Sequence, residues 1–288
     1  MQRMRYQNAQ GAEIVFDFAA PYIFWKISGI ELPPVDPIGT QASGQHGYTL
    51  HSILLSSRIV RLTGHVHGVS GIPAMYEARK RLNAVCNPLL GLGTLVYEND
   101  AGAWQISAFC AGNPYAEKIK EIQTLDVTFE CPSPFWQNTV QDAVLLAYVE
   151  GGLEFPLVTP GEFGTLGYQA LIDNDSDALT PLEFYIDGGS TNPVITNTTT
   201  GEFIKLSKNL LPSDKLYINT DPEHVEVSLI TIDPYTNKEK RENAYGYLTF
   251  DSVPFQLVPG RNELIFRSDD ENKQVRIRIY FHKRFVGV

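Results

Sequence analysis

The chain has 288 residues, of which 43% are hydrophobic, enough apolar material for two ordinary globular domains. Its net charge is −10 at pH 7, and no basic block offers the phosphate-neutralising surface of a nucleic-acid-binding protein, so no specific nucleic-acid binding is expected. No run of 18 apolar residues occurs, and Glu13 and Asp17 interrupt the first 25 residues, so we expect neither a membrane span nor an export signal.

The negative charge is concentrated in the second half. Residues 1–138 hold 10 Lys+Arg and 11 Asp+Glu, a net charge of −1, whereas residues 139–288 hold 13 and 22, a net charge of −9. Turn-forming residues without an apolar period occupy Cys131 to Asn138, between the two halves. We therefore divide the chain into a first domain, 1–138, and a second domain, 139–288.

The first half is predicted to be mainly β. Short runs rich in β-branched and aromatic residues indicate strands at 13–18, 22–30, 48–55, 58–68, 94–98, 103–110 and 122–131. Within 58–67, apolar residues alternate with a second set that should share the opposite face, namely Ile59, Arg61, Thr63, His65 and His67.

One helix interrupts these strands. Between Ile72 and Cys86, apolar residues recur at three- and four-residue spacing, with polar residues between them. Pro73 suits the first turn, and Asn87 followed by Pro88 predicts a left-handed cap that ends the helix. We expect this helix to cover the open end or flank of a β-barrel.

The segment Leu32 to Gly47 is predicted to be a long mobile loop. It holds three prolines and three glycines in sixteen residues and has little to bury. Loops of this length inside compact domains are usually functional.

The second half is predicted to be an antiparallel sandwich without a helix. Strands recur about every ten residues, at 168–173, 182–187, 194–197, 202–205, 215–220, 225–230, 262–267 and 274–281. The segment from Gln274 to Tyr280 alternates without a break, as a strand with one solvated face does.

Candidate metal sites are weak. His65 and His67 would point to the same side of a strand, with His46 and His51 near in sequence, but no spacing selects further zinc ligands. Asp173, Asp175 and Asp177 resemble the start of a calcium loop that lacks its required glycine and glutamate. The three cysteines match no metal or disulfide spacing and are predicted to be buried free thiols. We therefore predict no metal and no cofactor.

No catalytic motif is recognisable, so no catalytic residue is assigned. Twenty-two acidic residues in the second half offer many carboxylate pairs and single out none. Aromatic residues are expected mainly to fill cores. The ones to test for sugar stacking on the sandwich are Phe184, Tyr185, Tyr245, Tyr247 and Phe250.

Several segments, taken in order, resemble the distal tail proteins of siphophages. They include Gly44-Gln45-His46-Gly47 before a strand, Ser57-Arg58-Ile59-Val60-Arg61-Leu62-Thr63-Gly64, the helix that leads to Cys86-Asn87-Pro88, Gly93-Thr94-Leu95-Val96-Tyr97, and Phe129-Glu130-Cys131-Pro132-Ser133-Pro134-Phe135-Trp136. In the second half they are Asn192 to Gly201, Val258 to Asn262, and a last strand running to Val288. The strongly acidic second half and the His65/His67 pair depart from the family pattern.

The resemblance implies a tail-tube-like β-barrel with one helix, followed by a galectin-like antiparallel β-sandwich. It further implies a structural virion protein at the tail tip, assembled in the host bacterial cytoplasm, whose first domain joins copies of itself into a hexameric ring. Its partners would be the tail tube protein, the tail-tip hub or tail-associated protein and the receptor-binding protein. Candidate residues for the interface between copies are Arg58, Arg61, His65, His67, Gly44 and Gly47.

Two other functions remain open on the sequence. The first is a carbohydrate-binding module that uses the sandwich to recognise cell-wall carbohydrate of the host. The second is an enzyme acting on wall glycans, which needs a pair of facing carboxylates.

Overall fold

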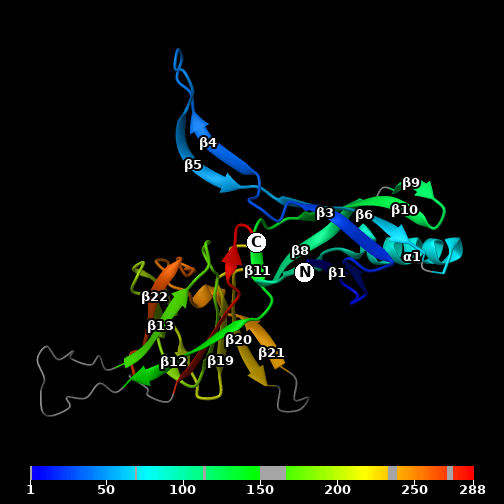
Figure 1. Ribbon diagram of the computed structural model, residues 1–288. Helices are drawn as coiled ribbons and strands as arrows, with labels where there is room; N and C mark the ends of the chain where they lie inside the picture. Colours follow the sequence, from blue (N-terminus) through cyan, green and yellow to red (C-terminus); the bar gives the residue numbers. More distant parts are fainter. Residues whose placement is uncertain (1, 69, 113–114, 150–166, 233–238, 271–274) are drawn as a thin grey trace, which may run out of the picture. The chain divides into compact units, whose positions relative to one another are not determined.

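The computed structural model describes the chain except for residues 1, 69, 113–114, 150–166, 233–238 and 271–274 (Figure 1). The chain divides into two compact units, which are described separately. The first comprises Met1–Thr139 together with Phe285–Val288, and the second comprises Val140–Arg284. The last four residues, which the sequence division assigned to the second domain, thus pack with the first unit.

The first unit is built on one antiparallel sheet with the strand order β2-β1-β7-β8-β10-β6-β3. These strands are β1 (Arg3–Gln7), β2 (Glu13–Phe16), β3 (Tyr22–Ser28), β6 (Arg58–His67), β7 (Gly93–Asn99), β8 (Gly102–Gly112) and β10 (Ile122–Cys131). The short strands β9 (Tyr115–Ile119), β11 (Trp136–Asn138) and β24 (Arg284–Phe285) pair off this path. The predicted mainly β fold with one helix is confirmed. The barrel is not closed by a ladder, because the end strands β2 and β3 meet only in an isolated bridge between Asp17 and Ile23.

Helix α1 (Ile72–Val85) has the predicted position, with Pro73 in its first turn. Met75, Leu82 and Val85 are buried in the core of the first unit, since their spacing places them on one face of the helix. The predicted left-handed cap at Asn87 is wrong. Asn87 is extended, and its side chain accepts a hydrogen bond from the Leu89 backbone N–H, so that it caps the following 3-10 turn η1 (Pro88–Leu90).

Part of the segment predicted to be a long loop at 32–47 is a strand, which forms a two-stranded ribbon with the strand predicted at 48–55. Strands β4 (Val35–Thr40) and β5 (Thr49–Leu55) pair antiparallel with each other and form a separate sheet. Within the first unit, Figure 1 shows this ribbon extending away from the sheet. Pro37 is accommodated in a strand because a two-stranded ribbon consists of edge strands, where a missing N–H can face solvent.

The second unit is an antiparallel sandwich, as predicted. The strand order is β17-β16-β22-β13-β12-β23-β14-β19-β20-β21, and β12 pairs with β23 through its first half and with β13 through its second, so it belongs to both layers. The strands are β12 (Asp142–Val149), β13 (Gly167–Asn174), β14 (Glu183–Asp187), β16 (Val194–Asn197), β17 (Glu202–Lys205), β19 (Lys215–Asn219), β20 (Glu226–Ile232), β21 (Glu239–Asn243), β22 (Gly260–Arg267) and β23 (Arg276–Phe281). A small pair, β15 (Ser190–Thr191) and β18 (Asn209–Leu210), and a 3-10 turn, η2 (Tyr245–Tyr247), complete it.

The core of the second unit lies between its two layers. Inward residues of β14, β19 and β23, such as Phe184, Ile218 and Ile277, join Ile195 and Leu264 from the other layer in one buried cluster. In β23 the alternation predicted from the sequence is confirmed from Val275 onward, while Gln274 lies outside the described residues. This alternation leaves the second face of each layer to solvent.

Cys86, Cys110 and Cys131 are all free and buried in the first unit, as predicted. Burial in an apolar environment raises the pKa of the Cys131 thiol to about 12 and keeps it protonated. None of the helices in the described parts of the chain has the length and apolar character that a membrane crossing requires.

Replacement of Leu82 by alanine should destabilise the first unit by about 2–5 kcal/mol, because it leaves a cavity where α1 meets the core. All three tryptophans, Trp25, Trp104 and Trp136, belong to the first unit, so the urea dependence of tryptophan fluorescence reports on this unit alone. The exposed Lys80→Ala on the same helix serves as control and should change stability by less than about 0.5 kcal/mol. Equal effects of the two variants would contradict the assignment of the buried face.

Candidate assembly surface

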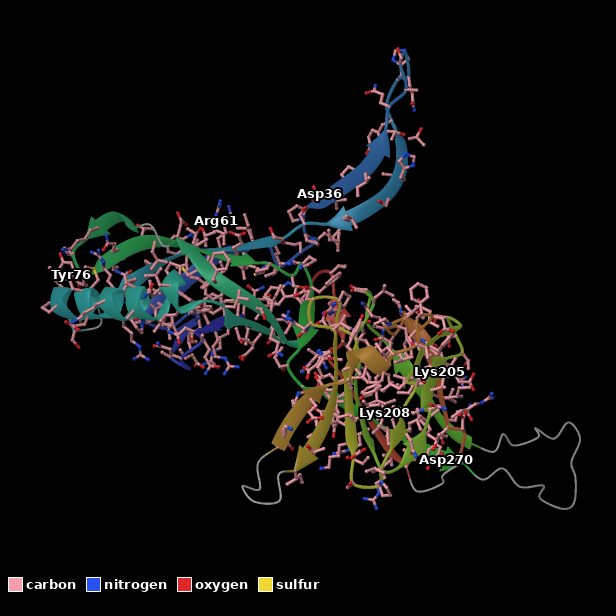
Figure 2. All side chains as sticks on the ribbon, turned by 180° about the vertical axis from the view of Figure 1, so that it is seen from behind. Asp36, Arg61, Tyr76, Lys205, Lys208 and Asp270 are labelled. Carbon is pink, nitrogen blue, oxygen red and sulfur yellow. The ribbon has the colours of Figure 1, made fainter. Side chains whose placement is uncertain are left out.

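The alternation of residues along β6 separates a buried face from an outer, more polar face, as the sequence predicted. Val60, Leu62 and Val66 are buried, while the intervening side chains lie on the opposite face at intermediate or high exposure. Figure 2 shows Arg61, which is exposed, on this face. Its neighbours in register are Thr128 on β10 and Ser28 on β3, so a polar row crosses three strands at this point.

An aromatic cluster occupies the other end of this face. The Trp25 and His65 rings lie 5.4 Å apart between centroids, and the His65 and His67 rings 6.4 Å apart. A β-bulge between Phe24 and Lys26 directs Trp25 outward, where it is 55% exposed. Partial burial, and then the neighbouring His67, lower the pKa of His65, so its neutral form is favoured.

Arg58 has a different role from the other candidate residues, because its side chain is 1% exposed and points into the first unit. Its guanidinium donates hydrogen bonds to the carbonyls of Gly29 at 2.8 Å and Pro134 at 2.8 and 3.0 Å, and to those of Glu31 and Val286. It also lies 5.8 Å from the centre of the Trp136 ring. Arg58 therefore stabilises the first unit internally, and we do not propose it further as a contact between copies.

The sequence contained a signal for this role. Arg58 has the same parity as Val60 and Leu62, which places it on the buried face of the strand, opposite Arg61. A buried arginine needs acceptors, and the neighbouring turn supplies them. Gly29 adopts φ +88°, and a Cβ there would collide with the Ile59 carbonyl, so glycine is required for this close approach.

The ribbon (β4, β5 and the turn between them) carries the most exposed apolar surface of this region. Six of its large apolar side chains are between 46% and 58% exposed, and they are Val35, Ile38, Tyr48, Leu50, Ile53 and Leu54. Val35, Pro37 and Ile53 share one face, whereas Ile38 and Leu54 lie on the other. Both faces of the ribbon are therefore apolar.

Gly44 and Gly47 lie in the turn that joins the two ribbon strands. Both adopt positive φ, +81° and +73°, and a Cβ at either position would meet nothing within 4 Å. Their role is to allow the backbone to reverse. They share the ribbon with His51, whose ring nitrogen lies 2.8 Å from the Thr40 hydroxyl, and with His46, which is exposed near the tip.

The histidines do not form a metal site in the part of the chain that the structure describes. Within those residues no three His, Cys, Asp or Glu side chains gather in the geometry of a metal centre. His46 and His51 lie on the ribbon, whereas His65 and His67 lie on the sheet. In the turn that resembled a calcium loop, the Asp175 carboxylate pairs with the Lys283 ammonium at 2.7 Å, which lowers the pKa of Asp175.

A comparison with models of known protein families finds one match. Residues 175–285 match the family of siphovirus-type tail components, in its C-terminal domain. Over this range the second unit is therefore similar to the C-terminal domain of siphovirus-type tail components. The predicted resemblance to distal tail proteins is confirmed by this match.

Three solved structures of phage proteins are similar in fold to this chain. The Dit protein (gp 19.1) of phage SPP1, described as a paradigm of the hub adsorption apparatus in Gram-positive infecting phages, is 11% identical with a TM-score of 0.71, and the match covers 99% of both chains. A chain of the phage P2 baseplate in its activated conformation with Ca is 12% identical with a TM-score of 0.56, over 100% of this chain and 99% of the other. A third, from the p2 baseplate with Sr, is 12% identical with a TM-score of 0.54, over 97% of each chain. No curated protein matches the sequence. At these identities the structures establish the fold of both units.

Arg58→Met should destabilise the first unit by about 3–5 kcal/mol, because it removes the donor that satisfies four backbone carbonyls. Arg61→Met, the same substitution on the opposite face of the same strand, should change stability by less than about 0.5 kcal/mol. Urea unfolding followed by tryptophan fluorescence measures both. A small effect of Arg58→Met would show that the internal network does not stabilise the unit.

The lowered pKa of His65 makes the stability of the first unit pH-dependent. Because the folded-state pKa lies below the unfolded value of about 6.5, the stabilising contribution is complete above that value and is lost as the pH falls through the folded-state pKa. Between pH 7.5 and 5, the urea midpoint should fall less in His65→Gln than in the wild type. His46→Gln, at the exposed ribbon tip, should keep the wild-type dependence, and an unchanged dependence in His65→Gln would exclude this residue as the source.

Proposed function

We propose that this protein is a structural subunit of a phage tail tip, in which the first unit joins copies of itself into a hexameric ring. The observation that carries the proposal is the ribbon, whose two faces both expose large apolar side chains. Soluble monomers rarely leave such contiguous apolar surface in water. A ribbon of two strands is also marginally stable by itself. Contact with neighbouring subunits removes both problems.

Charge favours the first unit as the part that meets its copies. Residues 1–138 carry a net charge of −1, so that side-by-side packing meets little repulsion, while residues 139–288 carry −9. A ring of equivalent head-to-tail contacts is closed, so each ribbon has a partner surface and no copy is left at an end. The second unit, with its excess of acidic side chains, would remain in solvent on the outside.

The proposed partners follow from the relatives. The SPP1 protein is described as part of a hub adsorption apparatus, and the P2 chain belongs to a baseplate. We place the present protein in the virion tail tip, between the tail tube protein on one side and the tail-tip hub and receptor-binding protein on the other, assembled in the cytoplasm of the host bacterium. The role is structural, and the proposal includes no catalytic step.

The outer face of β6 provides a second surface for contact between copies. Arg61, His65 and His67 lie there with the exposed Trp25, a residue type that is enriched in protein interfaces. The proposal assigns these three residues, together with the ribbon turn at Gly44 and Gly47, to the interface region. Arg61 and the histidines supply directional polar contacts, and the ribbon supplies apolar area.

Light scattering coupled to gel filtration tests the ring. The wild type should form a particle with six times the mass of the 32.2 kDa chain, by itself or with a tail-tube partner. Ile53→Asp should shift the population to monomer, because it places a charge in apolar surface that assembly buries. Thr200→Asp, at an exposed turn of the second unit, adds the same charge and should leave assembly unchanged.

Two outcomes would contradict the proposal. One is a wild-type protein that remains monomeric at high concentration and in the presence of partner proteins. The other is an Ile53→Asp variant that keeps its native fluorescence and assembles as the wild type does.

A further inference from the structure

The second unit has a hollow of about 370 Å³ on the solvent face of the layer that contains β14, β19 and β23. We call it the tyrosine pocket. Among the residues that line it are Glu183 and Tyr185 from β14, Arg278 and Tyr280 from β23, and Arg241 from β21. All of these lie in the described part of the second unit and none belongs to the proposed assembly surface.

The strand register brings these side chains together. Inward residues of the same strands, such as Phe184, Ile186 and Ile277, fill the core, so the alternate residues project to the solvent side. Tyr185 pairs with Arg278 on one neighbouring strand and with Tyr217 on the other, while Glu183 pairs with Tyr280. Residues that are distant in the sequence thus share one small area of the sheet.

Ring contacts hold the aromatic part of the pocket in place. The Tyr185 ring centroid lies 4.9 Å from that of Tyr217 and 5.6 Å from that of Tyr280, the latter pair at 86°. Edge-to-face arrangements of this kind stabilise aromatic pairs. Because each ring restricts the next, the pocket is organised before any ligand arrives.

The two arginines are positioned by the same rings and by carboxylates outside the pocket lining. The Arg278 guanidinium lies 5.7 Å from the centre of the Tyr185 ring and 2.6 Å from the Asp187 carboxylate. The Arg241 guanidinium lies 4.9 Å from the centre of the Tyr217 ring and 3.4 Å from the Glu226 carboxylate. An arginine has five N–H donors, so each retains donors for a ligand after these contacts.

The positive and negative side chains in and beside the lining nearly balance each other. Arg241, Arg278 and Lys215 are balanced by Glu183 and Glu239 in the lining and by the paired Asp187 and Glu226. A strongly anionic ligand such as a nucleotide would meet these carboxylates. A hydroxyl group both donates and accepts, and neighbouring hydroxyls of a sugar ring therefore match alternating carboxylate and guanidinium groups, with a tyrosine against the apolar side of the ring.

We propose that the tyrosine pocket binds a neutral hexopyranose, as a free sugar unit or as part of a polysaccharide. Arg241 and Glu183 bind the sugar hydroxyls, and Tyr185 contacts the ring. Of the residues that the sequence indicated for sugar contact, only Tyr185 lies in the pocket lining. Phe184 is buried in the core, and Tyr245, Tyr247 and Phe250 are exposed on another segment. The sugar site does not depend on assembly of the protein into a hexameric ring.

Ligand-observed NMR titration of the full chain tests this proposal. The probes are the methyl glycosides of glucose, mannose and galactose, and at least one should bind saturably with a Kd on the order of 1 mM, the affinity that a ligand of this size supports. Arg241→Gln and Glu183→Gln should each raise the Kd about tenfold, since each removes a hydrogen bond to a charged group.

Arg276→Gln is the matched control, because it changes an exposed arginine on the same strand as Arg278 outside the pocket lining. It should leave the Kd unchanged, and tyrosine near-ultraviolet circular dichroism checks that each variant is folded. Three results would overturn the proposal. They are no binding of any of the three glycosides, equal binding by the wild type and the two pocket variants, and binding of glucose 6-phosphate more than tenfold tighter than that of the neutral glycosides.

Discussion

The buried guanidinium of Arg58 is the interaction on which the first unit depends. Removing a charge from water is costly, and burial lowers the pKa of Arg58 accordingly. Among the described residues, the guanidinium is bonded to backbone carbonyls rather than to a carboxylate. Its five donors are used on carbonyls from three separate segments, at residues 29–31, 134 and 286. One side chain thus joins the turn after β3, the end of the first unit, and the chain terminus.

Val286, one of the acceptors, belongs to the segment by which the chain returns to the first unit. Phe285 to Val288 return to the first unit, so the second unit is an insertion between Thr139 and Phe285 rather than a terminal extension. Val286 accepts a hydrogen bond from Arg58, and the backbone N–H of Val288 donates to the Ile30 carbonyl at 3.1 Å. These two hydrogen bonds hold the returning segment within the first unit. A division at residue 138 misses this because the return consists of four residues, too few to show a composition of their own.

Much of the fold could be predicted because alternation is a direct consequence of one-sided burial. In β6, β10, β16, β17 and β23 the apolar period marks the core face, and the predicted bounds agree with the structure to within a few residues. β12 was missed because it joins both layers and reads as a nearly continuous apolar run, Ala143 to Val149. Strand β4 was missed because Pro37 and Gly39 are typical of loops, and because it pairs only with β5. Arg58 was placed at an interface because its charge was weighed above its position on the strand.

The ribbon combines apolar faces with edges that resist further pairing. Pro37 lacks an N–H, the register shifts between Ile38 and Gly39, and Asp36 carries a charge beside them. Each of these features hinders the addition of another strand, which is how natural edge strands avoid aggregation. The apolar side chains on the two faces are unaffected by this protection. In the proposed assembly, a partner surface would therefore meet the ribbon through side-chain packing rather than through backbone hydrogen bonds. Such a contact would select one specific surface, because packing requires complementary shape, whereas backbone pairing accepts almost any strand.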